Sequence, residues 1–242
     1  MKYFITLLYM ISFVSINADW NPDYSLMDDD VSVLGTKDYL DFRQTVCSSL
    51  ENTWCSAEKA QLLMDLTMVT KPKVCVEIGA FVGSSILPVA ATLNKLKQGK
   101  VYAVDAWSNV IACRYLEDND PNKAWWSTVD MPAVHGMFDQ LMNQWQLNAI
   151  CVTLQEPSEE AVVMLDEIDF LHFDGDYSLK GSMDDVMMYV PKVKSGGYIL
   201  FSNLYTTVNS KHPKLKAFCK LFESCEMICS IERDNAVLFK KY

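Results

Sequence analysis

KVCVEIGAFVGSSI, from Lys73 to Ile86, predicts a short buried strand, a glycine-rich turn and the beginning of a helix. Strand-favouring residues lead to Glu77, a carboxylate expected at the carboxyl end of the strand. Gly79 and Gly83 follow. Glycines let the backbone approach a ligand closely, and free N–H groups at a helix start attract a carboxylate or phosphate. The stretch therefore predicts either a ligand-binding turn or an ordinary strand–turn–helix corner.

The glycine spacing separates two classes of ligand. A dinucleotide-binding turn carries G-x-G-x-x-G, whose glycines pack around a pyrophosphate. Here the pattern is E-x-G-x-x-x-G, which suits a ligand that carries both an ammonium and a carboxylate. A nicotinamide-dependent oxidoreductase is therefore the weakest of the functions considered.

The size and charge of the chain limit the classes of partner that it is expected to bind. Its 242 residues fit one α/β domain with ample apolar content for a core. A formal net charge of −10 disfavours a nucleic-acid surface, because neutralising phosphates requires a basic face. We therefore expect a small-molecule partner and no nucleic acid, and the sequence indicates no oligomeric state.

Residues 1–18 have the pattern of a signal peptide. Lys2 precedes an apolar run, Phe4 to Ile16, which is too short to cross a bilayer comfortably. A polar segment follows, and cleavage is expected after Ala18. The alternatives are a short uncleaved anchor, which would be the link to a membrane, or a wrongly assigned start. The segment predicts export or membrane association, and a cytoplasmic protein if it is not functional.

The chain has eight cysteines, an even number that permits disulfides in an exported protein. Cys75 and Cys151 lie in apolar strand runs, where a buried thiol acts as a small hydrophobe. The plausible bridges involve Cys47 with Cys55 and the three cysteines near the C-terminus, Cys219, Cys225 and Cys229. No C-x-x-C pair occurs, so a zinc cluster is not expected.

Strands alternate with helices along the rest of the chain. We expect strands at 74–78, 101–104, 149–154, 169–173, 198–202, 226–231 and 236–240. We expect helices at 36–70, 84–97, 131–147, from Pro157, at 179–190 and at 213–222, with an irregular aromatic-rich insertion at 106–130. Gly196 and Gly197 are expected to turn into the fifth strand.

This order predicts an α/β fold with a doubly wound, mostly parallel seven-stranded sheet and extra N-terminal helices. We divide the chain into the leader at 1–18, an N-terminal helical extension at 19–71 and the main domain at 72–242.

Polar residues follow successive expected strands. They are Glu77, Gly79, Gly83 and Ser85, then Asp105, then Glu156, Pro157 and Ser158, then Asp174 and Asp176, and last Asn203. A single acid at such a place often caps the next helix. Placed together at the carboxyl ends of parallel strands, these residues predict a ligand site in the crevice there.

This set resembles the class I S-adenosylmethionine (SAM)-dependent methyltransferases over about residues 72–242. EIGAFVGSS is similar to the first motif of small O-methyltransferases of the catechol and caffeoyl-CoA type. DGDYSLKGSMDDVMMYVPKVKSGGYILFSN resembles the branch that includes macrolide sugar O-methyltransferases. The resemblance implies a Rossmann-like methyltransferase fold and SAM as cofactor.

The resemblance also assigns roles to residues. Those expected to bind the methionine part of SAM are Glu77, Gly79 and Gly83, with Ser85 near its carboxylate and Asp174 near its ammonium. Asp105 would hold the ribose hydroxyls. The residues beside the adenine would be Ser158 and Glu159, with the stretch around Trp107.

The resemblance implies a divalent cation in some relatives, where Asp174 would be a ligand. Those relatives commonly end the fifth strand with Asp-Asp or Asp-Asn, whereas this chain has Ser202 and Asn203. Magnesium strongly prefers anionic oxygen ligands. A magnesium site built from Asp174 and Asn203, with help from Asp176, is therefore expected to be weak or absent.

Methylating a hydroxyl requires an in-line nucleophile and a group that takes its proton. The candidate catalytic residues are Asp176, Tyr177 and His135. Tyr177 stands where catechol-type enzymes have a lysine base, and a tyrosine is a poor base near neutral pH unless its pKa is lowered. His172 lies inside a strand and is expected to be a packed side chain.

The sequence thus predicts a SAM-dependent methyltransferase that O-methylates a small-molecule hydroxyl. The adjacent Trp125 and Trp126 form either an acceptor lid or a hydrophobic plug. The alternative function is a SAM-binding or interaction protein that keeps the fold without turnover. The altered residues on the acceptor side and the leader favour that alternative.

Overall fold

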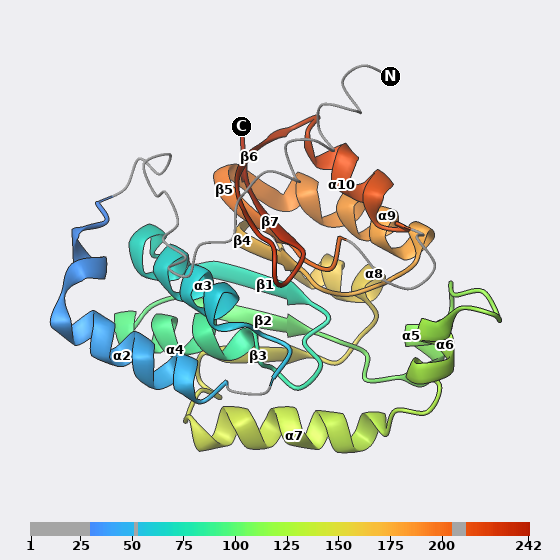
Figure 1. The fold of residues 1–242 in the computed structure, drawn as a ribbon, viewed down its shortest axis with the longest axis horizontal. Helices are drawn as coiled ribbons and strands as arrows, with labels where there is room; N and C mark the ends of the chain where they lie inside the picture. Colours follow the sequence, from blue (N-terminus) through green and yellow to red (C-terminus); the bar gives the residue numbers. More distant parts are fainter. Residues whose placement is uncertain (1–29, 51–52, 205–211) are drawn as a thin grey trace.

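The computed structural model describes residues 30–50, 53–204 and 212–242, so the predicted leader lies outside the described residues. The chain folds around one seven-stranded sheet (Figure 1) with the strand order β3-β2-β1-β4-β5-β7-β6. The strands are β1 Val74–Ile78, β2 Lys100–Val104, β3 Cys151–Leu154, β4 Ile168–Phe173, β5 Val193–Phe201, β6 Cys225–Ile231 and β7 Ala236–Lys241.

The sheet is mostly parallel. Strand β1 lies at its centre and pairs in parallel with β2 and β4, while β7 runs antiparallel to both β5 and β6. The register aligns the carboxyl ends of the central strands, with Ile78 opposite both Val104 and Phe173. The predicted fold class is confirmed, and the residues that follow these strands meet at one edge of the sheet.

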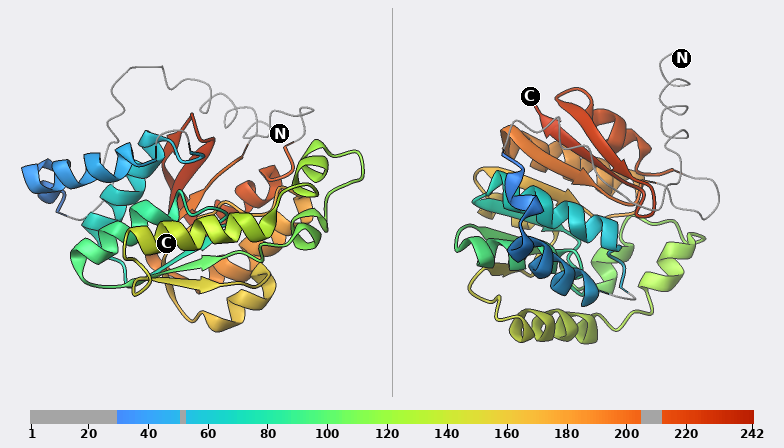
Figure 2. Two further views of the ribbon diagram at one scale, coloured as in Figure 1. Left: turned by 90° about the horizontal axis from the view of Figure 1, so that it is seen from below. Right: turned by 60° about the vertical axis from the view of Figure 1, so that its left-hand side comes forward.

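Helices cover both faces of the sheet, as Figure 2 shows from two further directions. The longer helices are α2 Lys37–Ser48, α3 Ala57–Thr70, α4 Ile86–Leu96, α7 Met131–Gln144, α9 Leu179–Tyr189 and α10 Leu215–Leu221. One face packs against α2, α3, α4 and α7, and the other against α9, α10 and the short helix α8 Ser158–Ala161. Each face of the sheet carries its own hydrophobic cluster. Alternate residues of a strand belong to the two clusters, because successive side chains point to opposite faces.

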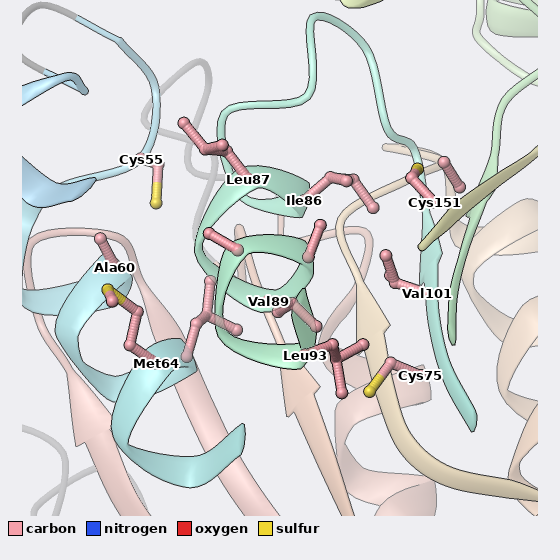
Figure 3. Packing of buried hydrophobic residues seen from close by; sticks show 14 of the residues in the cluster. Cys55, Ala60, Met64, Cys75, Ile86, Leu87, Val89, Leu93, Val101 and Cys151 are labelled. Carbon is pink, nitrogen blue, oxygen red and sulfur yellow. The ribbon is translucent and has the colours of Figure 1, made fainter. Parts of the chain in front are cut away.

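Helix α3 belongs to the main core. Ala60 and Met64 on α3 pack in the same buried cluster as Val89 and Leu93 on α4 (Figure 3). Ser56 caps α3, since its hydroxyl accepts a hydrogen bond from the backbone N–H of Lys59 at 3.0 Å. The N-terminal extension therefore contributes to the same hydrophobic cluster as the predicted main domain.

Two expectations about local structure were wrong. Gly196 and Gly197 lie inside β5 rather than in a turn before it. The β4–β5 pairing shifts register in this region, which accommodates the positive φ of Gly196 within the strand. The insertion at 106–130 is also more regular than expected, with helices α5 Asn109–Cys113 and α6 Pro121–Trp126.

The predicted disulfide candidates are not bonded. All eight cysteines are free thiols, and Cys75 and Cys151 are buried among apolar side chains as expected. Burial raises the pKa of the Cys55 and Cys229 thiols, which favours their neutral form. No helix among the described residues is long and apolar enough to cross a membrane.

Candidate functional site

A cavity of about 430 Å³ lies at the carboxyl ends of the central strands, where the sequence predicts the binding site. The predicted site residues that line it are Gly79, Ser85, Asp105, Ser158, Asp174, Asp176, Tyr177 and Asn203. Glu77, Gly83, Glu159 and His135 do not line it. The structure thus brings most of the predicted residues to one cavity.

The glycine turn fits closely against the end of β4. Gly79 has a φ of +88°, and a Cβ placed there would lie 2.7 Å from the Cα of Gly175 and 2.8 Å from the carbonyl carbon of Asp174. The N–H of Gly79 donates to the carbonyl of Val104 at 2.8 Å. Only glycine combines this backbone conformation with this approach. The turn is therefore fixed against both neighbouring strands.

Asp105 holds the loops on either side of the cavity. Its two carboxylate oxygens accept hydrogen bonds from the backbone N–H groups of Phe81 at 2.9 Å and Trp107 at 2.8 Å. Burial raises its pKa against the opposing effect of these bonds. An ionised carboxylate has further lone pairs, so Asp105 can still accept hydrogen bonds from a ligand's hydroxyls.

Glu77 faces a buried polar cluster instead of the cavity. Ser85 donates a hydrogen bond of 2.5 Å to Glu77, and Nδ1 of His172 lies 3.0 Å from its other oxygen. Nε2 of His172 is 2.8 Å from the hydroxyl of Ser202. The expectation that His172 is a packed side chain is confirmed, since it is 1 % exposed.

Asp174 is held by donors on both oxygens. Nζ of Lys59 lies 2.7 Å from Oδ2, and Nδ2 of Asn203 donates to Oδ1. Burial alone would raise the pKa of Asp174, but the positive charges of Lys59, His172 and Lys214 outweigh it and lower that pKa. Asp174 is therefore an anion near neutral pH.

Lys59 is a site residue that the sequence reasoning missed. It lines the cavity, yet only 2 % of the residue is exposed. Burial disfavours its charge, but the nearby acids, Asp174 first, raise its pKa above the ordinary value. The one available signal was a lysine on a helix whose other residues are mostly apolar, because a buried lysine requires a partner.

The residues at the predicted magnesium site do not fit a divalent cation. Asn203 presents an N–H group to Asp174, and the ammonium of Lys59 takes the other oxygen. Among the residues that the structure describes, a group with metal-ligating atoms within 4.8 Å of one another consists of Glu77, His172 and Asp174. The ammonium of Lys59 stands beside Asp174 in that group, so a cation there would meet a like charge.

Two of the three catalytic candidates are poorly suited to take a proton. Burial, with the charge of Asp174, raises the pKa of Tyr177, so its hydroxyl stays protonated near neutral pH. The ring of His135 stacks on Trp107 with centroids 4.2 Å apart, and His135 does not line the cavity. The prediction of His135 as a catalytic residue therefore finds no support in its position.

Asp176 is the remaining candidate, and it lines the cavity. Its Oδ1 accepts a hydrogen bond of 2.6 Å from the backbone N–H of Ser178, at the start of α9. The carboxylate lies against Gly181, where a Cβ would meet its oxygen at 2.1 Å. Asp176 is therefore held in one place by the helix start.

Two other predicted cofactor residues have structural neighbours. Glu159 pairs with Arg114, whose side chain lines the cavity. A Cβ on Gly83 would lie 2.9 Å from the ring of Phe138. Glu159 therefore holds a side chain that lines the cavity, whereas Gly83 packs against Phe138, which does not line it.

Aromatic rings form one wall of the cavity. Trp54, Phe81, Trp126 and Tyr177 all line it. The rings of Trp54 and Phe81 are stacked with centroids 4.8 Å apart, and Trp126 lies 6.0 Å from Tyr177. Trp125 packs edge-on against Trp126 and is 43 % exposed. We refer to Trp54, Phe81, Trp126 and Tyr177 as the aromatic wall.

Asp185 on α9 is a second site residue that the sequence reasoning missed. It lines the cavity, is 4 % exposed and accepts a hydrogen bond of 2.5 Å from the hydroxyl of Ser158. Burial raises its pKa to about 7. The carboxyl group next to Ser158 therefore changes its charge near neutral pH.

Asp185 should make stability depend on pH. Its pKa is higher in the folded chain than in the unfolded one, so its contribution is fully present below about pH 4 and is lost as the pH rises through about 7. In urea unfolding, the free energy of unfolding of the wild type should fall between pH 4 and 8 by about 2 to 4 kcal/mol more than that of Asp185→Asn. The control is Asp184→Asn, next to it on α9 but paired with Lys180 at the surface. An unchanged pH profile in Asp185→Asn would contradict the assignment.

Comparison with known protein families gives a match over the central part of the chain. The family described as "Methyltransferase domain" matches residues 76–204. No curated protein is similar enough to the chain in sequence to count as a match. The matched range contains the glycine turn and the carboxyl ends of β1 to β5.

Solved structures of methyltransferases share the fold at low sequence identity. The O-methyltransferase NovP is 15% identical over 77% of this chain and 80% of its own, with a TM-score of 0.60. An O-methyltransferase from Bacillus cereus, solved with SAH, is 14% identical over 87% and 94%, with a TM-score of 0.56. TomG from Streptomyces achromogenes, an O-methyltransferase of tomaymycin synthesis solved with SAM, is 10% identical over 97% and 94%, with a TM-score of 0.55.

Proposed function

Because this chain belongs to the methyltransferase domain family, we propose that it transfers the methyl group of SAM to a hydroxyl oxygen of a small molecule. The fold shared with O-methyltransferases supports the choice of oxygen as the acceptor atom. The observation that carries the proposal is the cavity in which the glycine turn, Asp105 and Asp174 meet.

The cavity fits SAM by its own geometry. Gly79 gives a bare backbone surface, and Asp105 offers carboxylate lone pairs to ribose hydroxyls. Ser158 is the first residue of α8, which follows β3, and it lines the part of the cavity where the adenine would be held. Asp174 keeps a negative charge, and its carboxylate has lone pairs beyond those that accept from Lys59 and Asn203, so it could still meet the ammonium of the methionine part.

The reaction needs few groups from the protein. SAM would supply a methyl group bound to a sulfonium. In the transfer, the S–CH₃ bond breaks with its electron pair going to sulfur, and an O–CH₃ bond forms. The acceptor oxygen must lie in line with that bond, and the hydroxyl proton must leave. The aromatic wall would position a flat acceptor, and Asp176 is the carboxylate in the cavity best placed to receive the proton.

Asp105→Ala should weaken SAM binding. The substitution removes the acceptor of two backbone hydrogen bonds as well as the group that would meet the ribose. A loss of about 2 to 4 kcal/mol corresponds to a roughly 30- to 1,000-fold increase in Kd. Isothermal titration calorimetry with SAM measures the Kd of the full-length wild type and of full-length Asp105→Ala.

A matched control is Asp169→Ala, which also removes a carboxylate that accepts two backbone hydrogen bonds, from Lys73 and Val74, but lies at the start of β4. That variant should bind SAM like the wild type. No SAM binding by the wild type would contradict the proposal. Binding without methyl transfer to a panel of small phenols and alcohols would favour the binding protein that lacks turnover.

A further inference from the structure

Resting on the proposed function, we propose that the ammonium of Lys59 takes the place of a divalent cation beside Asp174 and receives an anionic oxygen of the acceptor. Methyl transfer by this chain would then need no metal ion. Three sets of contacts carry this inference: those of Lys59, those of Asp174, and those of the polar cluster behind them.

Lys59 has unused hydrogen-bonding capacity in the cavity. Within the described ranges its ammonium donates one hydrogen bond, to Asp174 at 2.7 Å. An ammonium has three donors, so two N–H groups remain for a ligand. The residue is 2 % exposed and lines the cavity. A buried cation with free donors is suited to an oxygen that carries negative charge.

The contacts of Asp174 are those of a carboxylate that already has its cation. Asn203 presents Nδ2 to Oδ1, so the amide oxygen that could bind a metal is not turned toward Asp174. Ser202 stands where metal-dependent relatives carry a carboxylate, and its hydroxyl contacts His172 at 2.8 Å. A divalent cation carries two positive charges and the ammonium of Lys59 carries one. The site also has one carboxylate fewer, because Ser202 is neutral, so the charges still balance.

The polar cluster behind Lys59 retains atoms able to ligate a metal. Glu77, His172 and Asp174 each offer one such atom, and these atoms lie within 4.8 Å of one another. Removing the ammonium leaves Asp174 without the positive charge that acts on it most strongly. The same pocket should then attract a divalent cation. Lys59 therefore decides which cation the site holds.

The aromatic wall indicates what the ammonium receives. Lys59 shares the cavity with the rings of Trp54, Phe81 and Trp126. Flat apolar surface next to one buried ammonium suits a planar ring that carries an ionised hydroxyl. The chemical class of acceptor is therefore an aromatic compound with an acidic hydroxyl group.

A manganese titration tests the substitution of the cation. Free Mn²⁺ is measured by electron paramagnetic resonance as it is added to the full-length wild type and to Lys59→Met, Lys59→Arg and Lys95→Met. Lys59→Met should bind Mn²⁺ at least about tenfold more tightly than the wild type, because a like charge has been removed. Lys59→Arg keeps the charge and should not gain affinity. Lys95→Met removes a lysine paired with Asp38 outside the cavity and should match the wild type.

Thermal unfolding keeps this test informative if Lys59→Met is unstable. Millimolar Mn²⁺ should raise the Tm of Lys59→Met and leave that of the wild type unchanged, since only the variant has a cation site to fill. Tight Mn²⁺ binding by the wild type, or no gain in either measurement for Lys59→Met, would overturn the substitution. SAM titration of the wild type separates this failure from failure of the proposed function.

The ionisation of 4-nitrophenol tests the contact with the acceptor. In the presence of SAH, the wild type and Lys59→Arg should bind the phenolate and lower the apparent pKa of the probe, as followed by its visible absorbance. Lys59→Met should bind it at least about tenfold more weakly. Equal binding by wild type and Lys59→Met, or binding by neither, would remove Lys59 from the acceptor contact.

Discussion

Gly79→Ala is expected to weaken SAM binding roughly 100-fold. The new methyl group would lie 2.7 Å from the Cα of Gly175 and 2.8 Å from the backbone of Asp174, closer than any Cβ contact can be. The φ of +88° adds strain for an L residue. Relief of both requires the turn to move away from β4, which would distort the cavity floor. A loss of about 3 kcal/mol in binding free energy corresponds to a roughly 100-fold weaker Kd.

The matched control is Gly196→Ala. Gly196 also has a positive φ, of +77°, but a Cβ there would meet nothing within 4 Å. It should lose about 1 kcal/mol of stability from backbone strain and bind SAM like the wild type. Calorimetric titration of both variants, with unfolding in urea as a check on folding, separates the two effects. Wild-type affinity in Gly79→Ala would show that the turn does not contact the cofactor.

Asp174→Asn is expected to cause the largest loss of stability among single substitutions in the cavity. It removes the carboxylate that contacts the ammonium of Lys59, a residue that is 2 % exposed. Breaking one partner out of a buried pair costs about 3 to 5 kcal/mol, because the remaining charge stays desolvated. For a chain of this size, the Tm should fall by roughly 10 °C.

A double-mutant cycle tests the cause of that loss. Lys59→Met combined with Asp174→Asn removes both charges, so the double variant should lose less stability than the sum of the two single variants. The exposed pair of Lys95 with Asp38 provides the reference, and Lys95→Met should cost at most about 1 kcal/mol. Additive losses in the cavity would show that the two charges do not stabilise each other.

Much of the sheet could be predicted from the sequence, because its central strands are short apolar runs with sharp ends. Val74–Ile78 was predicted to the residue, since Pro72 precedes the strand and a glycine turn follows it. Gly196 and Gly197 were misplaced because two glycines usually break a strand, whereas here β5 pairs with β4 on both sides of them, at Val193 and at Tyr198. Pairing of distant strands is not visible in local sequence.

The same limit applies to the site. Asp105 and Asp174 could be located because strand ends in this fold meet at one edge of the sheet. Lys59 could not, because it reaches Asp174 from 115 residues away along the chain. His135 does not line the cavity, and the sequence does not show which side of α7 faces it. Asp185 was missed because its importance comes from burial next to Ser158.

The position of α3 has a consequence for how the cavity could be altered. Ser56, which caps α3, also donates a hydrogen bond to Asp234 in the β6–β7 hairpin, and Lys59 follows one turn later. Both ends of this link lie outside residues 76–204, the range by which kinship is recognised. Lys59 and Trp54 therefore line the cavity from outside the stretch that defines the family, whereas Phe81, Trp126 and Tyr177 line it from inside that stretch. Exchanging the helix and the hairpin together would keep the Ser56–Asp234 contact while changing the part of the cavity that Lys59 and Trp54 line.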